Sequence, residues 1–276
     1  MMPDAKPPGR VLVVEDNEVN QALALAILAK LGYRSDVVGD GREAVELVPR
    51  GGYEAVLMDC QLPVLDGYQA TAQIRRREGT ARRTPIIAMT AGIVEDRQAC
   101  LAAGMDDHIA KPVLLAEVRE VLGRWLQDGA DRPDRRWPAT AEGPAGEVLD
   151  QRRLAELGGL DPTGNGTALV GRLLESFLAR IPSDLADLRT AFDHGDAARA
   201  LRVSHRLKGA AATVGSSGMV RLCEQLELRT RAGTVLPEDL LPLLEQEFGR
   251  VIRALNAILP GRRAPDPEGA RPGGGG

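Results

Sequence analysis

Four short apolar segments in the first half of the chain are each followed by side chains that can bind a metal ion or a phosphoryl group. They are Glu15 and Asp16 after the first segment, then Asp59, Thr90 and Lys111. Crowded carboxylates repel one another unless a cation joins them, and hard oxygen ligands suit Mg²⁺. A carboxylate beside that metal can attack a phosphoryl group, while an ammonium neutralises charge on its oxygens. These residue types predict a magnesium-dependent phosphoryl acceptor.

The second half of the chain contains one histidine that could accept the same group. Around His205, residues 203, 207, 210 and 214 are apolar at helical spacing, and His205 is about 200° away from Val203 on the helix. We therefore expect His205 on the solvent side, largely neutral at pH 7 and able to accept a phosphoryl group. Lys208, about 60° away, could stabilise the transferred charge. Gly209 costs about 1 kcal/mol in a helix interior, which indicates a role other than helix stability.

In the first half of the chain, short apolar runs alternate with longer segments whose apolar residues recur at helical spacing. Elements of these two kinds must position Glu15, Asp16, Asp59, Thr90 and Lys111. The predicted strands are residues 11–14, 36–38, 55–58, 86–89 and 109–110. The predicted helices follow Asn17 and then cover residues 41–48, 67–77, 94–103 and 114–126. This alternation predicts a doubly wound α/β domain with a five-stranded parallel sheet. Ligands of such sheets bind beyond the carboxyl ends of the strands, where the polar residues lie.

The rest of the chain divides by composition. Residues 1–9 are predicted to be disordered, 10–127 to form the α/β domain, and 128–148, rich in Pro, Gly and Ala, to form a flexible linker. Residues 149–259 show only helical periods and predict an all-α bundle, in which Pro182 should kink or divide a long helix. Residues 260–276 are predicted to be a disordered tail.

Composition excludes several classes of protein. The 276 residues suffice for roughly two domains, and 35 Lys and Arg against 39 Asp and Glu give a net charge of −4, so neither nucleic acid nor an anionic membrane is an expected partner. The longest apolar run, residues 22–29, is too short to span a membrane. Three scattered cysteines argue against a disulfide framework, and the polar, Pro-rich start is no signal peptide. We expect a cytoplasmic protein.

The motifs V-L-V-V-E-D, M-D-C-Q-L-P-V-L-D-G, M-T-A and D-D-H-I-A-K-P occur in this order over residues 10–127. This segment closely resembles a response-regulator receiver domain, which implies the flavodoxin-like strand order 2-1-3-4-5. The resemblance implies that Asp59 is the phosphoacceptor and that a Mg²⁺ ion is held by Glu15, Asp16, Asp59 and the backbone carbonyl of Gln61.

The same resemblance assigns further roles. Thr90 and Lys111 match the family's switch pair, and the Lys111–Pro112 bond is often cis in such domains. His108 occupies the place where the family usually has a switch Tyr or Phe, so the resemblance does not imply an aromatic switch residue at this position.

The segments S-H-R-L-K-G-A-A-A-T-V-G and L-C-E-Q-L-E, within residues 150–259, resemble a histidine phosphotransfer domain, a four-helix bundle. The resemblance implies that His205 is the phosphohistidine and that Lys208 and Gly209 belong to the family's H-x-x-K-G pattern.

Together the two resemblances predict a phosphorelay intermediate, with a histidine kinase as phosphodonor and a downstream receiver domain as a partner. The chain has no ATP-binding pattern, so autokinase activity is not expected. The roughly 20-residue linker spans about 25 Å as a random coil, which would allow His205 to meet Asp59 within one molecule. Two alternatives stay open: an interaction protein that inhibits a kinase or regulator without onward transfer, and, less favoured, a metal-dependent aspartyl phosphatase.

Overall fold

Five parallel strands form the sheet of the first domain in a computed structural model, which describes residues 9–78, 83–90, 94–126, 148–161, 166–232, 237 and 239–258. The strands are β1 (Arg10–Val14), β2 (Arg34–Val38), β3 (Ala55–Asp59), β4 (Ile86–Thr90) and β5 (Asp107–Ala110). Their order, β2-β1-β3-β4-β5, confirms the predicted topology. In the register, Val14 is paired with Met58 and Asp59 with Met89, so the ends of β1, β3 and β4 meet at one edge.

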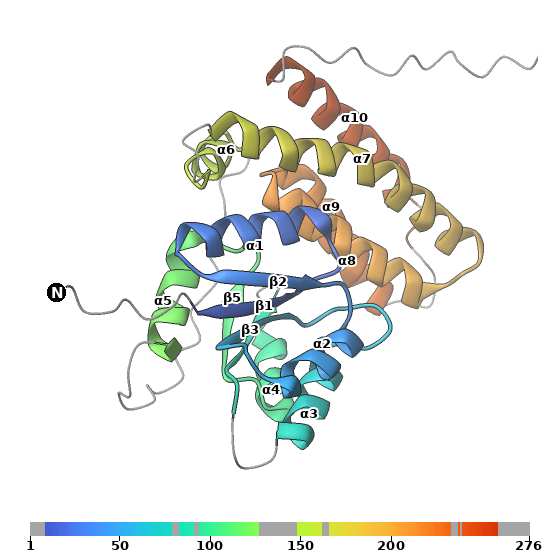
Figure 1. The fold of residues 1–276 in the computed structure, drawn as a ribbon. Coiled ribbons are helices and arrows are strands. Elements are labelled where there is room, and N and C mark those ends of the chain that lie inside the picture. Colours follow the sequence, from blue (N-terminus) through green and yellow to red (C-terminus); the bar gives the residue numbers. More distant parts are fainter. Residues whose placement is uncertain are drawn as a thin grey trace, which may run out of the picture.

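Helices cover both faces of this sheet (Figure 1). The helices are α1 (Glu18–Lys30) and α5 (Leu115–Leu126) on one face, and α2 (Gly41–Leu47), α3 (Gly67–Glu78) and α4 (Val94–Ala103) on the other. Side chains alternate along β1, so Val11 and Val13 pack toward α1 while Leu12 and Val14 pack toward α2 and α3. The helix predicted over residues 41–48 ends at Leu47 and continues as a short 3₁₀ turn, Val48–Arg50.

Helix α1 buries residues on more than one side. Its N-cap is Asn17, whose Oδ1 accepts hydrogen bonds from the backbone N–H groups of Val19 and Asn20. Val19, Leu23 and Ile27 lie at helical spacing on one face of α1 and are buried. Asn20, Ala24 and Leu28 are buried as well, and α1 also contacts the later helical part of the chain, so a second side of this helix is covered.

The second domain is helical. Its helices are α6 (Gln151–Gly158), α7 (Gly166–Asp193), α8 (Ala197–Thr213), α9 (Ser217–Ala232) and α10 (Leu240–Ile258). Pro182 lies inside α7 without dividing it, so of the two predicted effects, a kink or a division, the division is wrong. Proline cannot donate the backbone hydrogen bond that an interior helical position makes. Ile181 and Leu185, on either side of Pro182, are buried and keep the helix packed against the core. Phe177 meets Phe248 edge to face at 6.4 Å between ring centroids.

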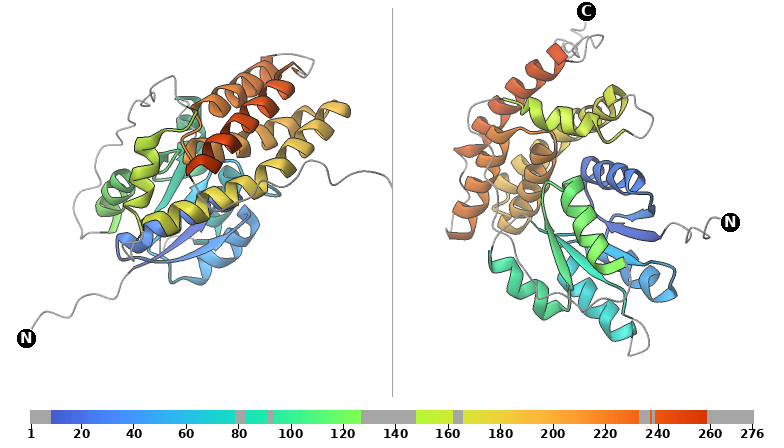
Figure 2. Two further views of the ribbon diagram at one scale, coloured as in Figure 1. Left: turned by 90° about the horizontal axis from the view of Figure 1, so that it is seen from above. Right: turned by 90° about the vertical axis from the view of Figure 1, so that its left-hand side faces the viewer.

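The two domains pack together along α1, which lies against α7 and α8 (Figures 1 and 2). One cluster of buried apolar side chains runs from the sheet through α1 into the helical core. The linker 128–148, apart from Val148, and both predicted disordered ends, apart from Gly9, lie outside the described residues. In the part of the chain that is described, no helix combines the length and apolarity needed to cross a bilayer.

Candidate functional site

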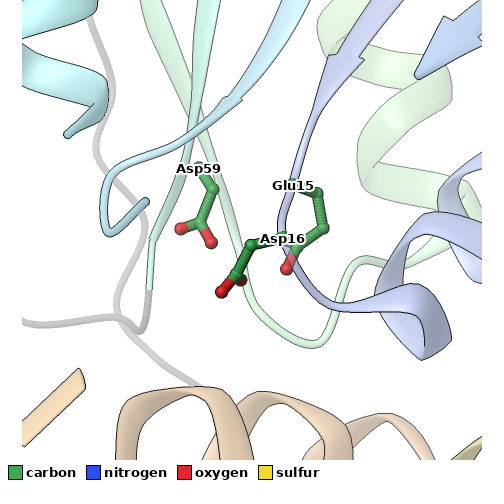
Figure 3. A group of neighbouring side chains, drawn as sticks. All are labelled: Glu15, Asp16 and Asp59. Atoms are coloured by element: carbon green, nitrogen blue, oxygen red, sulfur yellow. The ribbon is translucent and has the colours of Figure 1, made fainter. Parts of the chain in front are cut away.

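Three carboxylates meet at the carboxyl edge of the sheet. Glu15 and Asp16 come directly after β1, and Asp59 is the last residue of β3. One oxygen of each lies within 4.8 Å of the others, and the Asp16 and Asp59 side chains point toward the helix that passes below them in Figure 3. The predicted convergence of these carboxylates is therefore observed. A set of hard oxygen donors at this spacing fits a divalent cation such as Mg²⁺.

The electrostatics of this cluster are consistent with a cation site. Burial, then repulsion from Glu15, raises the pKa of Asp16 to about 6. Burial also raises the pKa of Asp59 to about 6, although Lys111 and, more weakly, His205 act in the opposite direction. Without a further positive charge, the carboxylates are held together at an energetic cost that a divalent ion would offset.

Lys111 binds two of the three carboxylates. Its Nζ lies 2.7 Å from Glu15 Oε2 and 2.7 Å from Asp59 Oδ2. Burial acts to lower the pKa of Lys111, but the Asp59 and Glu15 carboxylates raise it above its ordinary value. Lys111 is therefore a permanently charged neighbour of the predicted phosphoacceptor, and the Lys111–Pro112 bond is cis as predicted.

The other predicted receiver residues lie around this cluster. Thr90 ends β4 and is buried, and its hydroxyl has no hydrogen-bond partner among the described residues. Such an orphaned donor suits a ligand oxygen that arrives later. The Gln61 N–H donates to Asp59 Oδ1 at 3.2 Å, which places Gln61 next to the cluster. His108 lies on β5 and is buried.

His205 is not on the solvent side, so this prediction is wrong. The stripe of Val203, Leu207, Ala210 and Val214 does face the helical core, as predicted. The opposite face of α8 is covered by the first domain, however, and His205 is only 7% exposed. The periodicity of one helix distinguishes a core side from another side but does not show what covers the latter. His205 instead lines a cavity between the domains with Asp16 and Gln61.

Glu227 on α9 is a residue that sequence reasoning missed. Its Oε2 accepts a hydrogen bond from Lys208 Nζ at 2.8 Å, and its Oε1 lies 3.6 Å from His205 Nδ1. Lys208, predicted to flank an exposed ring, is therefore buried and paired. Burial raises the pKa of Glu227, but the His205 ring and the Lys208 ammonium lower it more, so the net pKa lies below its usual value. Glu227 is the last residue of the L-C-E-Q-L-E segment, and its place in that motif was the signal that the sequence offered.

Polar contacts join the two domains beside the acidic cluster. Asn17 Nδ2 donates to the Arg206 carbonyl at 3.2 Å, and Thr213 Oγ1 donates to Asn20 Oδ1 at 2.8 Å. Asn20 Nδ2 in turn donates to Glu15 Oε1 at 3.1 Å. A Cβ on Gly209 would lie 3.0 Å from Asn20 Nδ2, so glycine permits the close approach of α8 to α1. The close contact with Asn20 explains why a glycine stands at position 209, although glycine is unfavourable in a helix.

Substitution of Gly209 by alanine should separate helix stability from docking. Alanine favours the helix by about 1 kcal/mol, but its Cβ would press on the Asn20 amide and loosen the domain contact. We expect a larger radius of gyration in small-angle scattering. Gly171→Ala on α7, where nothing lies within 4 Å, is the matched control and should leave the radius unchanged. Equal radii for the two variants would contradict the proposed role of Gly209.

Family comparisons agree with this geometry. The model of the response regulator receiver domain matches residues 11–123, and the model of the Hpt domain matches residues 172–255. The chain therefore contains a receiver domain followed by an Hpt (histidine phosphotransfer) domain, which is the architecture of two-component phosphorelay proteins.

Individual relatives are much longer proteins. The aerobic respiration control sensor protein ArcB of Escherichia coli K12 is 29% identical over 227 residues, which are 80% of this chain and 28% of ArcB. Hybrid signal transduction histidine kinase G of Dictyostelium discoideum is 40% identical over 119 residues, 42% of this chain and 4% of the relative. The chain thus spans less than a third of the length of these relatives.

Among solved structures, a similar chain is the receiver domain of sensor histidine kinase PA1611 from Pseudomonas aeruginosa PAO1, crystallised with a magnesium ion in its active site cleft. It is 50% identical, with a TM-score of 0.41, and the match covers 44% of this chain and 99% of that one.

Proposed function

We propose that this chain is a phosphorelay intermediate, in which Asp59 accepts a phosphoryl group and His205 carries one. The observation that carries the proposal is the shared cavity: His205 of the Hpt domain and Asp16 and Gln61 beside Asp59 line the same space. Placing donor and acceptor in one site converts transfer into an intramolecular step, where positioning supplies much of the rate.

A Mg²⁺ ion would be held by Glu15, Asp16, Asp59 and the carbonyl of Gln61. When bound, it would supply positive charge to the oxygens of the reacting phosphoryl group. In the receiver domain, the Asp59 carboxylate is the nucleophile, and Lys111 remains charged beside it. The unpartnered Thr90 hydroxyl donates to a phosphoryl oxygen.

On the Hpt side, Glu227 orients the imidazole. Its Oε1 and His205 Nδ1 are 3.6 Å apart, and neither atom has a hydrogen-bond partner in the described part of the chain. A proton held on Nδ1 beside this carboxylate leaves the lone pair on Nε2, the opposite edge of the ring. Lys208 holds the other oxygen of Glu227 and fixes its orientation. We therefore assign Lys208 an indirect role, through Glu227.

The implied partners are proteins that exchange phosphoryl groups with such domains: a histidine kinase as donor to Asp59 and a downstream receiver domain as acceptor from His205. The polar contacts of α1 with α8 support transfer between Asp59 and His205 within this chain as well. No observation on the described residues favours the inhibitor or phosphatase alternative. A cytoplasmic location stays a prediction.

The test is the chemical stability of the phosphoryl label. With Mg²⁺ and radiolabelled acetyl phosphate, we expect two kinds of label: an acyl phosphate on Asp59, lost in base, and a phosphoramidate on His205, lost in acid but stable in base. Chelation of the metal should abolish both, because the carboxylate cluster then lacks its compensating charge. A label that is insensitive to chelation, or that is of a single kind stable to both treatments, would contradict the proposal.

A further inference from the structure

Three arginine side chains line the cavity between the two domains. Its volume is about 410 Å³. Besides hydrophobic residues, the polar lining is Asp16 and Gln61 from the receiver domain and Asp187, Arg199, Arg202, His205 and Arg206 from the Hpt domain. A phosphoryl group that moves between Asp59 and His205 would pass beside these cations.

Arg206 is held in a fixed orientation. Its Nε donates to Asp184 Oδ1 at 3.0 Å, and Nη2 binds the same oxygen, while Asp187 Oδ2 lies 3.8 Å from Nη2. Asp184 is only 1% exposed, so it anchors one edge of the guanidinium within the helical domain. The planar fork is then presented toward the receiver domain with few rotamers available.

The free edge of Arg206 faces the acidic cluster. Its Nη1 lies 3.9 Å from Asp16 Oδ2, and both side chains are largely buried. Its backbone carbonyl accepts the hydrogen bond from Asn17, which fixes the main chain at the same place. Arg206 is thus tied to the receiver domain at both its main chain and its side chain.

Three of the other cations near the two reacting residues are engaged with other carboxylates, whereas Arg202 lines the cavity without an ion pair to a receiver carboxylate in the described residues. Lys111 binds Glu15 and Asp59, and Lys208 binds Glu227. Arg199 pairs with Asp187 at a half-exposed site. Within the described ranges, Arg206 is the one Hpt cation with an ion-pair contact to the receiver carboxylates.

We propose that Arg206 is a charge-stabilising residue for phosphoryl transfer between Asp59 and His205, a role that rests on the proposed function. In the step, the lone pair of His205 Nε2 forms an N–P bond while the P–O bond to Asp59 breaks. The bonding electron pair leaves on the Asp59 carboxylate, and the Nδ1 proton stays on the ring beside Glu227. Negative charge on the three transferring oxygens is greatest between the two residues, where Arg206 donates.

The experiment measures each half of the reaction separately in the full-length chain. Asp59 is loaded with acetyl phosphate and Mg²⁺, and the base-stable label on His205 is followed in single-turnover time courses. Arg206→Ala should load Asp59 as fast as wild type but pass the group to His205 on the order of 100-fold more slowly. Arg206→Lys keeps the charge without the fork and should recover part of this loss. Arg199→Ala, which alters another cavity arginine, should transfer at the wild-type rate.

Several outcomes would overturn the inference. The first is an unchanged transfer rate in Arg206→Ala, and the second is an equally slow transfer in Arg199→Ala. The third is a larger radius of gyration in Arg206→Ala, because separation of the two domains would then explain the slower transfer. Failure of the proposed function is distinguishable, because wild type itself would then show no base-stable label, and the inference would fall with it.

Discussion

Replacement of Asp59 by asparagine should abolish magnesium-dependent labelling by acetyl phosphate. Asparagine keeps the shape and one oxygen of the side chain but cannot form an acyl phosphate. Because no other route to His205 through the receiver domain exists in the proposed scheme, the base-stable label should disappear together with the acyl phosphate. The expected change is from stoichiometric label to background, measured by gel autoradiography.

Loss of label in this variant should not result from unfolding. Burial raises the pKa of Asp59 to about 6, so above pH 6 the ionised carboxylate destabilises the folded state, and a neutral amide removes this cost. We expect the thermal midpoint of Asp59→Asn at pH 7 to be no lower than that of wild type. Asp150→Asn, at the N-cap of α6 where asparagine caps equally well, is the control that should label normally. Full labelling of Asp59→Asn would mean that another residue is the acceptor.

The sheet and the acidic cluster could be predicted because their information is local. The strands β1, β3, β4 and β5 are short, mostly buried runs with a polar residue at or directly after their carboxyl ends. Parallel pairing brings such ends together whatever the loops do. Glu15, Asp16, Asp59 and Lys111 therefore lie where the strand periodicity implies. The strand bounds differ by one or two residues, because backbone pairing extends beyond the apolar run, as at Arg34 in β2.

The contact between the domains could not be predicted, because no periodicity within α8 records what lies on its polar side. A helix face with His205, Arg206 and Gly209 reads as solvated in isolation. Its burial depends on α1, nearly 190 positions earlier, whose Asn17 and Asn20 supply complementary groups. Glu227 was missed for the same reason, since its role depends on the packing of α9 against α8. The unexplained Gly209 was the one local sign of this approach.

This arrangement changes what an external partner meets. The α8 face of the Hpt domain covers the carboxyl edge of the receiver sheet, so a kinase or second receiver must displace one domain of this chain from the other to reach Asp59 or His205. Beside the reacting groups the contact consists of polar side chains, whereas farther along α1 buried apolar side chains continue into the helical core. Relative motion of two domains is the usual expectation unless their interface is large and hydrophobic. In the proposed scheme, Asp59 and His205 are therefore each other's first reaction partners.

Replacement of His205 by glutamine should separate the two halves of this chemistry. Glutamine lacks a nucleophilic ring nitrogen, so the acyl phosphate on Asp59 should form as in wild type while the base-stable label falls to background. Passage to a second chain gives a stricter measurement: loaded His205→Gln protein mixed with Asp59→Asn protein should label the latter's intact His205 in trans. His194→Gln, which changes an exposed histidine whose ring contacts the Thr190 carbonyl, should behave as wild type.

The rate of transfer between two chains also reports how often the two domains of one chain separate. Transfer between chains requires both molecules to open, so it should be slower than transfer within the wild-type chain at micromolar concentrations, where an effective concentration of order mM favours the tethered partner. Gly209→Ala in both chains should raise the rate in trans, because a loosened contact exposes Asp59 and His205 more often. A base-stable label on His205→Gln itself would assign the phosphohistidine to His108 or His194 and refute the role of His205.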